Sequence, residues 1–258
     1  MKKFFKYLYL VLIFIFLYAP IATLVVLSFN RSKSRVRWGG FSLRWYDQLF
    51  GSSTIMTALY NTLLIAFLSA LIATIIGTMA AIGINKMKKV PKSIVMGVNN
   101  IPLLNGEIVT GISLMLCFIA FGISLGFKTV LIAHITFNIP YVILSVMPKL
   151  KQITPGTYEA ALDLGATPTY AFFKVIFPEL LPGILSGYLL AFTMSLDDFI
   201  ITHFTRGAGI NTLSTLIYSE VRRGIKPTMY ALSTLLFVSV LVLLLFINRP
   251  VKPKKKKN

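Results

Sequence analysis

The chain has 258 residues, of which 56% are hydrophobic and only 13% are charged. This composition leaves too little polar surface to cover a water-soluble globule, so it excludes an ordinary soluble domain and indicates a membrane protein. The net charge of +18 would suggest nucleic-acid binding in a soluble protein, but here most basic residues lie between and beyond long apolar blocks. In that position they orient membrane spans. The sole cysteine, Cys117, lies inside an apolar block and supports neither a disulfide nor a metal-ligand cluster.

The first apolar block, at about residues 7–29, follows Lys2, Lys3 and Lys6. It is too long for a secretory signal peptide and no small-residue cleavage site ends it, so it predicts a retained spanning helix. Five further blocks approach the twenty residues that a span needs, at about 59–84, 94–121, 127–147, 183–204 and 230–247. The pattern predicts one all-α, polytopic membrane domain over residues 1–258 with six transmembrane helices.

The basic residues predict the direction of these spans. A cytoplasmic N-terminus also places residues 85–93, 148–182 and 248–258 inside the cell, and together with the N-terminal tip these segments hold 16 of the 26 basic residues. Both termini are therefore expected in the cytoplasm of a multi-pass inner-membrane protein. The basic tail, residues 249–258, is expected to be a solvated anchor near anionic membrane lipid.

One basic cluster opposes this rule. Arg31, Lys33, Arg35 and Arg37 follow the first span directly, on the side predicted to be outside. Contact with a partner and contact with lipid headgroups are both open explanations.

The segment between the fourth and fifth spans, at about 149–182, carries two signals for a helix start. In Thr154–Pro155 a capping threonine precedes a proline at the first helical position, where the missing N–H costs nothing. Thr167–Pro168 repeats this signal, and Gly165 between them is the residue that commonly ends a helix in a left-handed conformation. The pattern predicts a cytoplasmic helix-turn-helix with a glycine corner, whose second helix ends at Pro178.

Such a corner is compatible with a loop packed on its own bundle or with a docking surface for a partner. Its spacing is more specific. The run Glu159-Ala160-Ala161 is followed after three residues by Gly165 and, after nine more, by Val175-Ile176-Phe177-Pro178. This run resembles the EAA loop of the permease subunits of binding-protein-dependent ABC importers, with valine and phenylalanine in place of isoleucine and leucine.

The resemblance implies a type I ABC importer permease fold whose first short cytoplasmic helix couples to an ATPase. By that resemblance Glu159 faces the ATPase, Ala160 and Ala161 allow close approach, Gly165 makes the corner and Pro178 closes the motif. The chain itself has no G-x-x-x-x-G-K-[ST] run and no G-x-G-x-x-G run. ATP and Mg are therefore expected to bind a separate ATPase dimer, and this chain is expected to hold no catalytic residue, cofactor or metal.

Three of the eight acidic residues, Glu107, Asp197 and Asp198, lie inside predicted spans. An ionisable group there is costly and usually faces a pathway or a partner. At 1.5 Å per residue, Glu107 and Asp197 each lie about 20 Å from the start of their spans, which predicts a shared level in the outer half of the membrane.

Helical spacing separates the two aspartates. Asp198 belongs to a stripe of small and polar residues, whereas Asp197 lies beside leucine and isoleucine, so the pattern favours Asp198 as the pathway residue. Close helix packing explains the rest of the stripe equally well. Glu107 follows a helix-breaking run of asparagine, proline and glycine, which favours a position beside a cavity. His134 and His203 are interpreted as hydrogen-bonded packing residues rather than proton relays.

Acids in a pathway suit a cationic substrate. Four stretches, YAPIATLVVLSFN, GFSLRWYDQL, LGFKTVLIAHITFNIPYVI and SLDDFIITHF, resemble spermidine/putrescine permeases of the PotC type. That resemblance implies that Trp45, Glu107 and Asp198 take part in polyamine handling, with Asp197 undecided between pathway and packing. It also implies a second homologous permease and an extracytoplasmic polyamine-binding protein as partners, and no nucleic acid.

The expected function is therefore that of a permease subunit of an ATP-driven polyamine importer. An importer of another cationic or small metabolite is the nearest alternative. An ion-coupled secondary carrier and a non-transporting membrane scaffold are the more distant ones. This sequence does not predict a preference between spermidine and putrescine. The spacing of the charges in the substrate would be matched by residues of two permeases, and this chain is only one of them.

Overall fold

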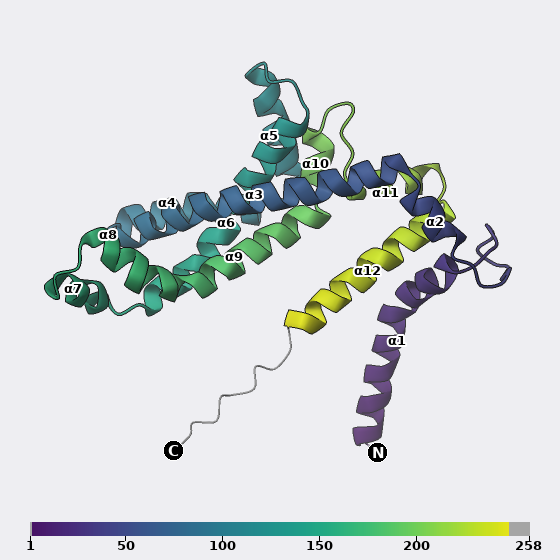
Figure 1. Cartoon of the computed structure of the whole chain (residues 1–258), viewed down its shortest axis with the longest axis horizontal. Coiled ribbons are helices and arrows are strands. Elements are labelled where there is room, and N and C mark those ends of the chain that lie inside the picture. Colours follow the sequence, from purple (N-terminus) through teal and green to yellow (C-terminus); the bar gives the residue numbers. More distant parts are fainter. Residues whose placement is uncertain (1, 248–258) are drawn as a thin grey trace. The chain divides into compact units, whose positions relative to one another are not determined.

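The computed structural model describes residues 2–247, and in this range the fold is all-α apart from one isolated antiparallel bridge between Asn30 and Phe41. The chain divides into two compact units (Figure 1). Unit one comprises Met1–Met56 with Ile217–Asn258, and unit two comprises Thr57–Leu216. The basic tail, residues 249–258, lies outside the described residues.

Unit one contains three helices, α1 (Lys2–Ser28), α2 (Arg44–Phe50) and α12 (Pro227–Ile247), of which α12 packs against the other two. Trp45 and Leu49 of α2 and Tyr230 of α12 are buried. By contrast, no residue in the apolar window of α1 is buried. Because the described part of the chain leaves most apolar side chains of this helix exposed, it requires lipid or another membrane protein around it.

Unit two is a bundle of long helices with short helices at its ends. Its elements in chain order are α3 (Ser53–Lys86), α4 (Lys89–Leu104), α5 (Glu107–Ala120), α6 (Phe127–Gln152), α7 (Pro155–Asp163), α8 (Pro168–Ala171), the π-helix η1 (Phe172–Ile176), α9 (Phe177–Asp197), α10 (Ile200–Thr205) and the start of α11 (Leu213–Arg223). The first residues of α3 and the last residues of α11 belong to unit one.

The core of unit two lies where α6 runs beside α9 and α3 (Figure 1). Glycines allow this close approach: a Cβ atom on Gly183 of α9 would lie 2.8 Å from Cγ of Lys149, and one on Gly77 of α3 would lie 2.8 Å from Val142. Gly187 also faces α6. Small residues at such spacing let membrane helices pack closely, so the stripe predicted on the fifth span is a packing face toward α6.

Four described helices are long and apolar enough to cross a membrane, or five if one bent pair counts as a single span. That pair corrects the sequence prediction, because residues 94–121 are not one straight span. They lie in α4 and α5, which meet at an angle of 105°. Asn105 and Gly106 adopt extended backbone between the two helices, just after Pro102 has removed one helical donor. Since Glu107 begins the second helix, the depth estimated along a straight span does not apply to it.

The other predicted spans overlap α1, α3, α6, α9 with α10, and α12. The apolar part of α12 whose side chains are described, Pro227–Ser239, is shorter than a full span. The count of six spans in a single domain therefore stays a prediction.

The predicted helix-turn-helix forms, and both of its helices begin where the sequence predicts. α7 begins at Pro155 after Thr154, and α8 begins at Pro168, where the Thr167 hydroxyl accepts a hydrogen bond from the Tyr170 N–H. Gly165 has a φ of +86°, which is the expected left-handed corner.

The predicted end at Pro178 is wrong, because α8, η1 and α9 form one helical run that continues to Asp197. The π-helical turn of η1 ends just before Pro178, which lies in the first turn of α9. The hydrogen-bond pattern changes at this point, so a residue without an N–H is tolerated there.

Candidate functional site

A break between α9 and α10 forms the centre of the candidate pathway. Asp198 leaves the helix with φ −58° and ψ 125°, and its carboxylate accepts hydrogen bonds from the next helix. The donors are the N–H of Ile201 at 3.3 Å, the N–H of Thr202 at 2.8 Å and the hydroxyl of Thr202 at 3.0 Å. Asp198 thus satisfies backbone groups that the first turn of α10 leaves free.

His134 of α6 contacts the same carboxylate oxygen that accepts from Thr202. Its Nε2 lies 3.4 Å from Oδ2 of Asp198 and 2.9 Å from the Thr202 hydroxyl, while its Nδ1 lies 2.5 Å from the Ser195 hydroxyl. The His134 and Asp198 side chains are only 2% and 5% exposed. His134 is buried and hydrogen-bonded, as expected from the sequence, but no sequence pattern predicts its contact with Asp198.

Further hydrogen bonds extend this contact into a polar cluster, which we define as Ser69, His134, Asn138, Ser195, Asp198, Thr202 and Ser214. The hydroxyls of Ser69 and Ser195 lie 2.9 Å apart, and the Asn138 amide donates to Ser69 at 3.5 Å. Ser214 donates to the backbone carbonyl of Asp198 at 2.7 Å. The polar cluster therefore ties α3, α6, α9 and the start of α11 to the break. Such networks stabilise a unique arrangement when their members are paired.

The exposures of the two aspartates are the reverse of what the stripe suggested. The Asp198 side chain is enclosed in the polar cluster, because the stripe faces α6, whereas Asp197 is an exposed residue at the last position of α9. Asp197 is thus the carboxylate that a molecule outside the bundle could reach. Asp198 follows it in the chain and fixes the backbone at the break through its hydrogen bonds to α10.

Glu107 lies exposed in the first turn of α5, immediately after the bend between α4 and α5. One turn along the same helix, a Cβ atom on Gly111 would lie 3.1 Å from the Phe204 ring and 3.5 Å from the Ile200 carbonyl oxygen. The helix that begins with Glu107 therefore packs against α10, the helix that begins after Asp197 and Asp198. The structure brings the segments carrying the three acids together in unit two.

Trp45 lies in unit one, not in the unit that holds the acids. Its ring is 2% exposed, and its indole Nε1 donates to the backbone carbonyl of Asn30 at 2.5 Å. The Arg44 guanidinium lies over the ring, 5.6 Å from the centroid. In this conformation Trp45 orders the segment that follows α1 rather than presenting its face to a substrate.

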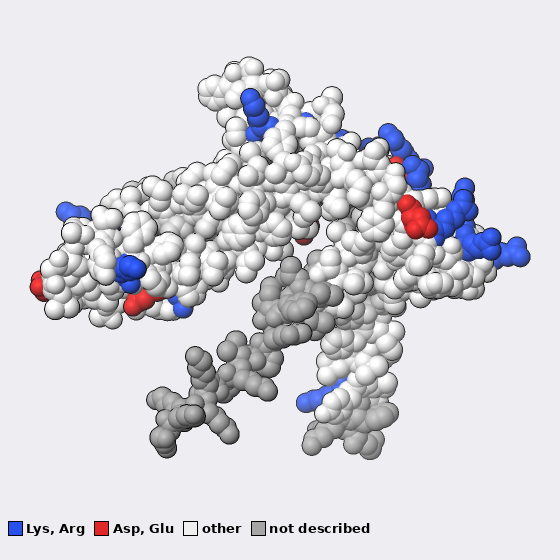
Figure 2. All heavy atoms as spheres, in the orientation of Figure 1, with Lys and Arg blue, Asp and Glu red and all other residues white. Residues whose placement is uncertain are grey.

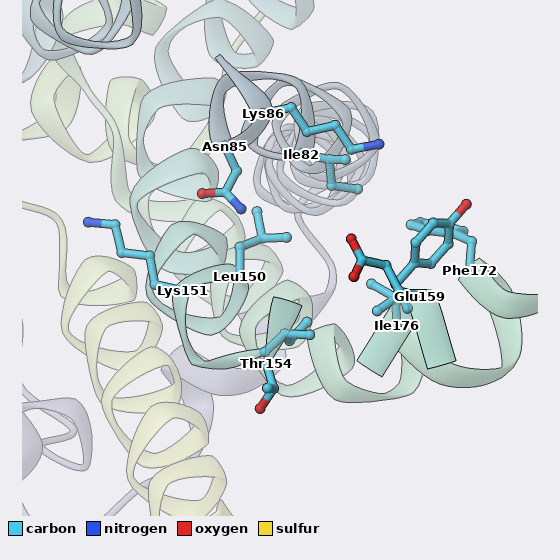
Figure 3. Close-up of a pocket in the computed structure, with 11 residues that line it drawn as sticks. Ile82, Asn85, Lys86, Leu150, Lys151, Thr154, Glu159, Phe172 and Ile176 are labelled. Carbon is cyan, nitrogen blue, oxygen red and sulfur yellow. The ribbon is translucent and has the colours of Figure 1, made fainter. Parts of the chain in front are cut away.

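The corner formed by α7, α8 and η1 borders an open cavity of about 570 Å³ (Figure 3). It is lined by residues from α3, α6, α7, η1 and the loop before α7: Ile82, Asn85, Lys86, Leu150, Lys151, Ile153, Thr154, Tyr158, Glu159, Phe172 and Ile176. Figure 3 shows the Glu159 carboxylate pointing into this space, whereas the ammonium groups of Lys86 and Lys151 point away from it. The sequence motif located Glu159 but not the cavity, because five separate segments build its walls.

The surface around the turn between α7 and α8 is apolar and exposed. Leu164 is 89% exposed, Tyr170 58% and Phe173 57%. Ala160 beside Glu159 is exposed and Ala161 is half-buried, so small side chains cover part of the surface. Exposed apolar side chains around an ordered turn are typical of a protein contact surface.

A family model described as "Binding-protein-dependent transport system inner membrane component" matches residues 44–257. The spermidine/putrescine permease protein PotC of Haemophilus influenzae is 38% identical over 94% of this chain and 95% of its own length. The Escherichia coli K12 putrescine permease protein PotI is 40% identical, over 87% and 83% respectively. The PotC protein of the same strain is 36% identical, over 95% and 93%.

Solved structures share the fold. A chain of a bacterial ABC transporter that imports alginate superposes with a TM-score of 0.70 at 18% identity, covering 96% of this chain and 94% of that one. A chain of the MetNI methionine ABC transporter gives 0.60 at 21% identity, covering 76% and 95%. Transport systems of this kind also comprise a binding protein and a separate ATPase, and the permease is their non-catalytic transport component. The chain belongs to the family of binding-protein-dependent transport system inner membrane components, the multi-pass permease subunits of ABC importers.

Proposed function

We propose that this permease carries polyamines, spermidine or putrescine, and forms the translocation pathway together with a second homologous permease subunit. The likeness to PotC and PotI over nearly the whole chain supports this substrate class. The observation that carries the proposal in the structure is the pair of exposed carboxylates, Glu107 and Asp197, at helix ends of an otherwise apolar bundle. Fixed carboxylates balance the charges of a protonated amine as it leaves water.

The acids have different tasks in this proposal. Glu107 and Asp197 contact the ammonium groups of the substrate, since both are exposed. Asp198 does not contact the substrate, because its carboxylate already contacts His134 and accepts hydrogen bonds from α10. Its task is to fix the backbone next to Asp197. The part of Trp45 in polyamine handling is indirect, through the outer segment that its indole orders.

The cytoplasmic corner between α7 and α8 couples the ATPase dimer to movement of the permease. Glu159, Ala160 and Ala161 form the docking face of α7, and Gly165 is the pivot between α7 and α8. The continuous run from α8 to α9 includes Pro178 without a break. A displacement of the corner therefore reaches the break at Asp198 through one helix, and rigid-body movement of this kind is a common route to alternating access.

The proposed orientation places both termini and the α7–α8 corner in the cytoplasm. An extracytoplasmic polyamine-binding protein then delivers the substrate from the opposite side, and membrane lipid covers the apolar face of α1. ATP and Mg bind only to the ATPase subunits.

Uptake by cells that lack their own polyamine transport tests the proposed substrate. The complete importer containing this chain should accumulate radiolabelled spermidine or putrescine, and an ATPase variant without hydrolysis should abolish the accumulation. An assembled importer that accumulates neither amine would contradict the polyamine assignment and point to another cationic metabolite. Accumulation that persists with the inactive ATPase would instead indicate an ion-coupled carrier.

A further inference from the structure

Unit one carries a concentration of exposed cations that the transport pathway does not use. We define the outer basic surface as the exposed residues Arg31, Lys33, Arg35, Arg37 and Arg44, together with Arg222, Arg223 and Lys226. The first five lie between α1 and α2 or at the start of α2, and the last three lie between the end of α11 and α12. In Figure 2, Lys and Arg side chains gather over these segments.

The segment after α1 is ordered before any partner arrives. Asn30 is 2% exposed, and its side chain donates to the carbonyls of Ser34 and Arg37 and accepts from the N–H groups of Ser32 and Gly39. The Arg31 N–H also donates to the Gly40 carbonyl at 2.9 Å. Because these bonds hold the loop, its cations bind a partner with less loss of conformational entropy than those of a flexible tail.

Most positive charges of this surface have no ion-pair partner in the described part of the chain. Within the described residues, the ion pairs of unit one amount to Glu220 with Lys226, at 3.1 Å. Arg31, Lys33, Arg35 and Arg37 form no ion pair with any described carboxylate. These four residues also oppose the charge rule that orients the spans, so topology does not account for them.

A cationic substrate does not account for them either. A protonated polyamine is repelled by a surface of its own charge, so the outer basic surface is not a funnel for the free substrate. Its partner is an anion, and this step rests on the proposed function and orientation.

The chemistry of the surface favours carboxylates of a protein. All arginines of the chain except Arg206 and Arg249 lie in it, whereas the segments predicted to be cytoplasmic use lysine almost throughout. Arginine binds a carboxylate with two parallel hydrogen bonds, whereas lysine acts as a point charge. Between the arginines, Val36 is 97% exposed, Phe41 69% and Trp38 53%. Arginine mixed with aromatic side chains on a fixed loop is the composition of a protein interface.

We infer that the outer basic surface is the docking site for an acidic face of the extracytoplasmic binding protein on which this transport family depends. The ordered arginines select that protein and speed its arrival by electrostatic attraction. Delivery from the docked protein then avoids the repulsion that the surface exerts on free polyamine.

Binding of the cognate binding protein to the complete importer tests this inference. The importer is placed in nanodiscs of phosphatidylcholine, with and without phosphatidylglycerol, and its affinity for the binding protein is measured at increasing NaCl. The wild-type affinity should fall as salt screens the charges. The double variant Arg35→Gln with Arg37→Gln should bind about tenfold more weakly at low salt in both lipids, with a shallower dependence on NaCl.

The double variant Lys88→Gln with Lys89→Gln is the matched control, because it removes the same charge from an exposed turn predicted to be cytoplasmic. It should bind like the wild type. An Arg35/Arg37 variant that binds like the wild type would overturn the inference. A difference confined to nanodiscs with phosphatidylglycerol would assign the surface to lipid instead. Since affinity is measured without transport, failure of the importer to carry polyamines is detected separately, in the uptake assay.

Discussion

The polar cluster at the break between α9 and α10 and the corner between α7 and α8 each contain a carboxylate, but the two carboxylates have opposite surroundings. Asp198 is enclosed and accepts from backbone, hydroxyl and histidine groups. Glu159 is exposed and points into an open cavity, without a hydrogen-bond or ion-pair partner in the described part of the chain. A paired, buried charge fixes the fold locally, whereas an unpaired, exposed charge is available to a second molecule.

The largest expected effect comes from removing the partner of the buried charge. His134→Leu leaves the Asp198 carboxylate buried without its imidazole, which should destabilise the protein by about 3–5 kcal/mol. Thermal unfolding of the purified importer measures this loss. The double variant His134→Leu with Asp198→Asn should lose less than the sum of the two single variants, because no buried charge remains. Additive losses would show that the two residues act independently.

The exposed charge predicts loss of a partner with little loss of stability. Glu159→Lys should weaken association with the ATPase about a hundredfold, the effect expected for a buried interfacial charge that is reversed, while insertion and melting stay unchanged. Co-purification with the ATPase measures the association. Glu179→Lys is the matched control, because Glu179 is an exposed acid outside the motif, in the first turn of α9. Unchanged co-purification of the Glu159 variant would remove this residue from the coupling surface.

Neighbouring aspartates sharpen the comparison further. Asp197→Asn should reduce polyamine uptake about tenfold by raising KM, with melting unchanged, because Asp197 is exposed. Asp198→Asn should also reduce uptake in an importer that still assembles, but its melting temperature should fall as hydrogen bonds of the polar cluster are lost. Uptake kinetics and melting curves of the two variants give the test. If Asp197→Asn lowers stability as much as Asp198→Asn does, the distinction between the two sites fails.

The smallest effect is expected at the corner itself. Gly165 has a positive φ and open space around it, so Gly165→Ala meets no neighbour but should cost about 1 kcal/mol in backbone strain. The result should be a modest loss of transport per ATP hydrolysed. Gly156→Ala is the control, since Gly156 in α7 also has open space but no positive φ. Equal behaviour of the two variants would show that the left-handed corner is not needed for coupling.

The structure of the corner follows from local sequence signals, whereas the structure of the polar cluster does not. At the corner, Thr154–Pro155, Thr167–Pro168 and Gly165 act through local backbone chemistry, and the structure has the predicted helix starts and the predicted left-handed glycine. The same local rules predict a helix end at Pro178. This prediction is wrong, because the π-helical turn just before Pro178 changes the hydrogen-bond pattern and the helix continues.

At the polar cluster, local rules were insufficient. Helical spacing predicts the stripe that includes Asp198. Whether the stripe is exposed depends on whether α6 covers that face of the helix, and helical spacing does not predict which helix packs there. His134 is 64 positions away from Asp198 in the chain, so no short motif links them. The run from Pro102 to Gly106 predicts a break before Glu107, but the angle of 105° between α4 and α5 is not a property of local spacing.

Membrane residence, the all-α class and the position of the corner between α7 and α8 along the chain were determined by the sequence alone, because span length, composition and helix-start chemistry act within a few turns of the chain. Only the tertiary structure decided which aspartate is buried, which histidine pairs with it, how sharply the third predicted span bends and which segments line the cavity beside Glu159. Each of these depends on contacts between segments far apart in the chain, and burial is a property of the packed neighbours rather than of the residue itself.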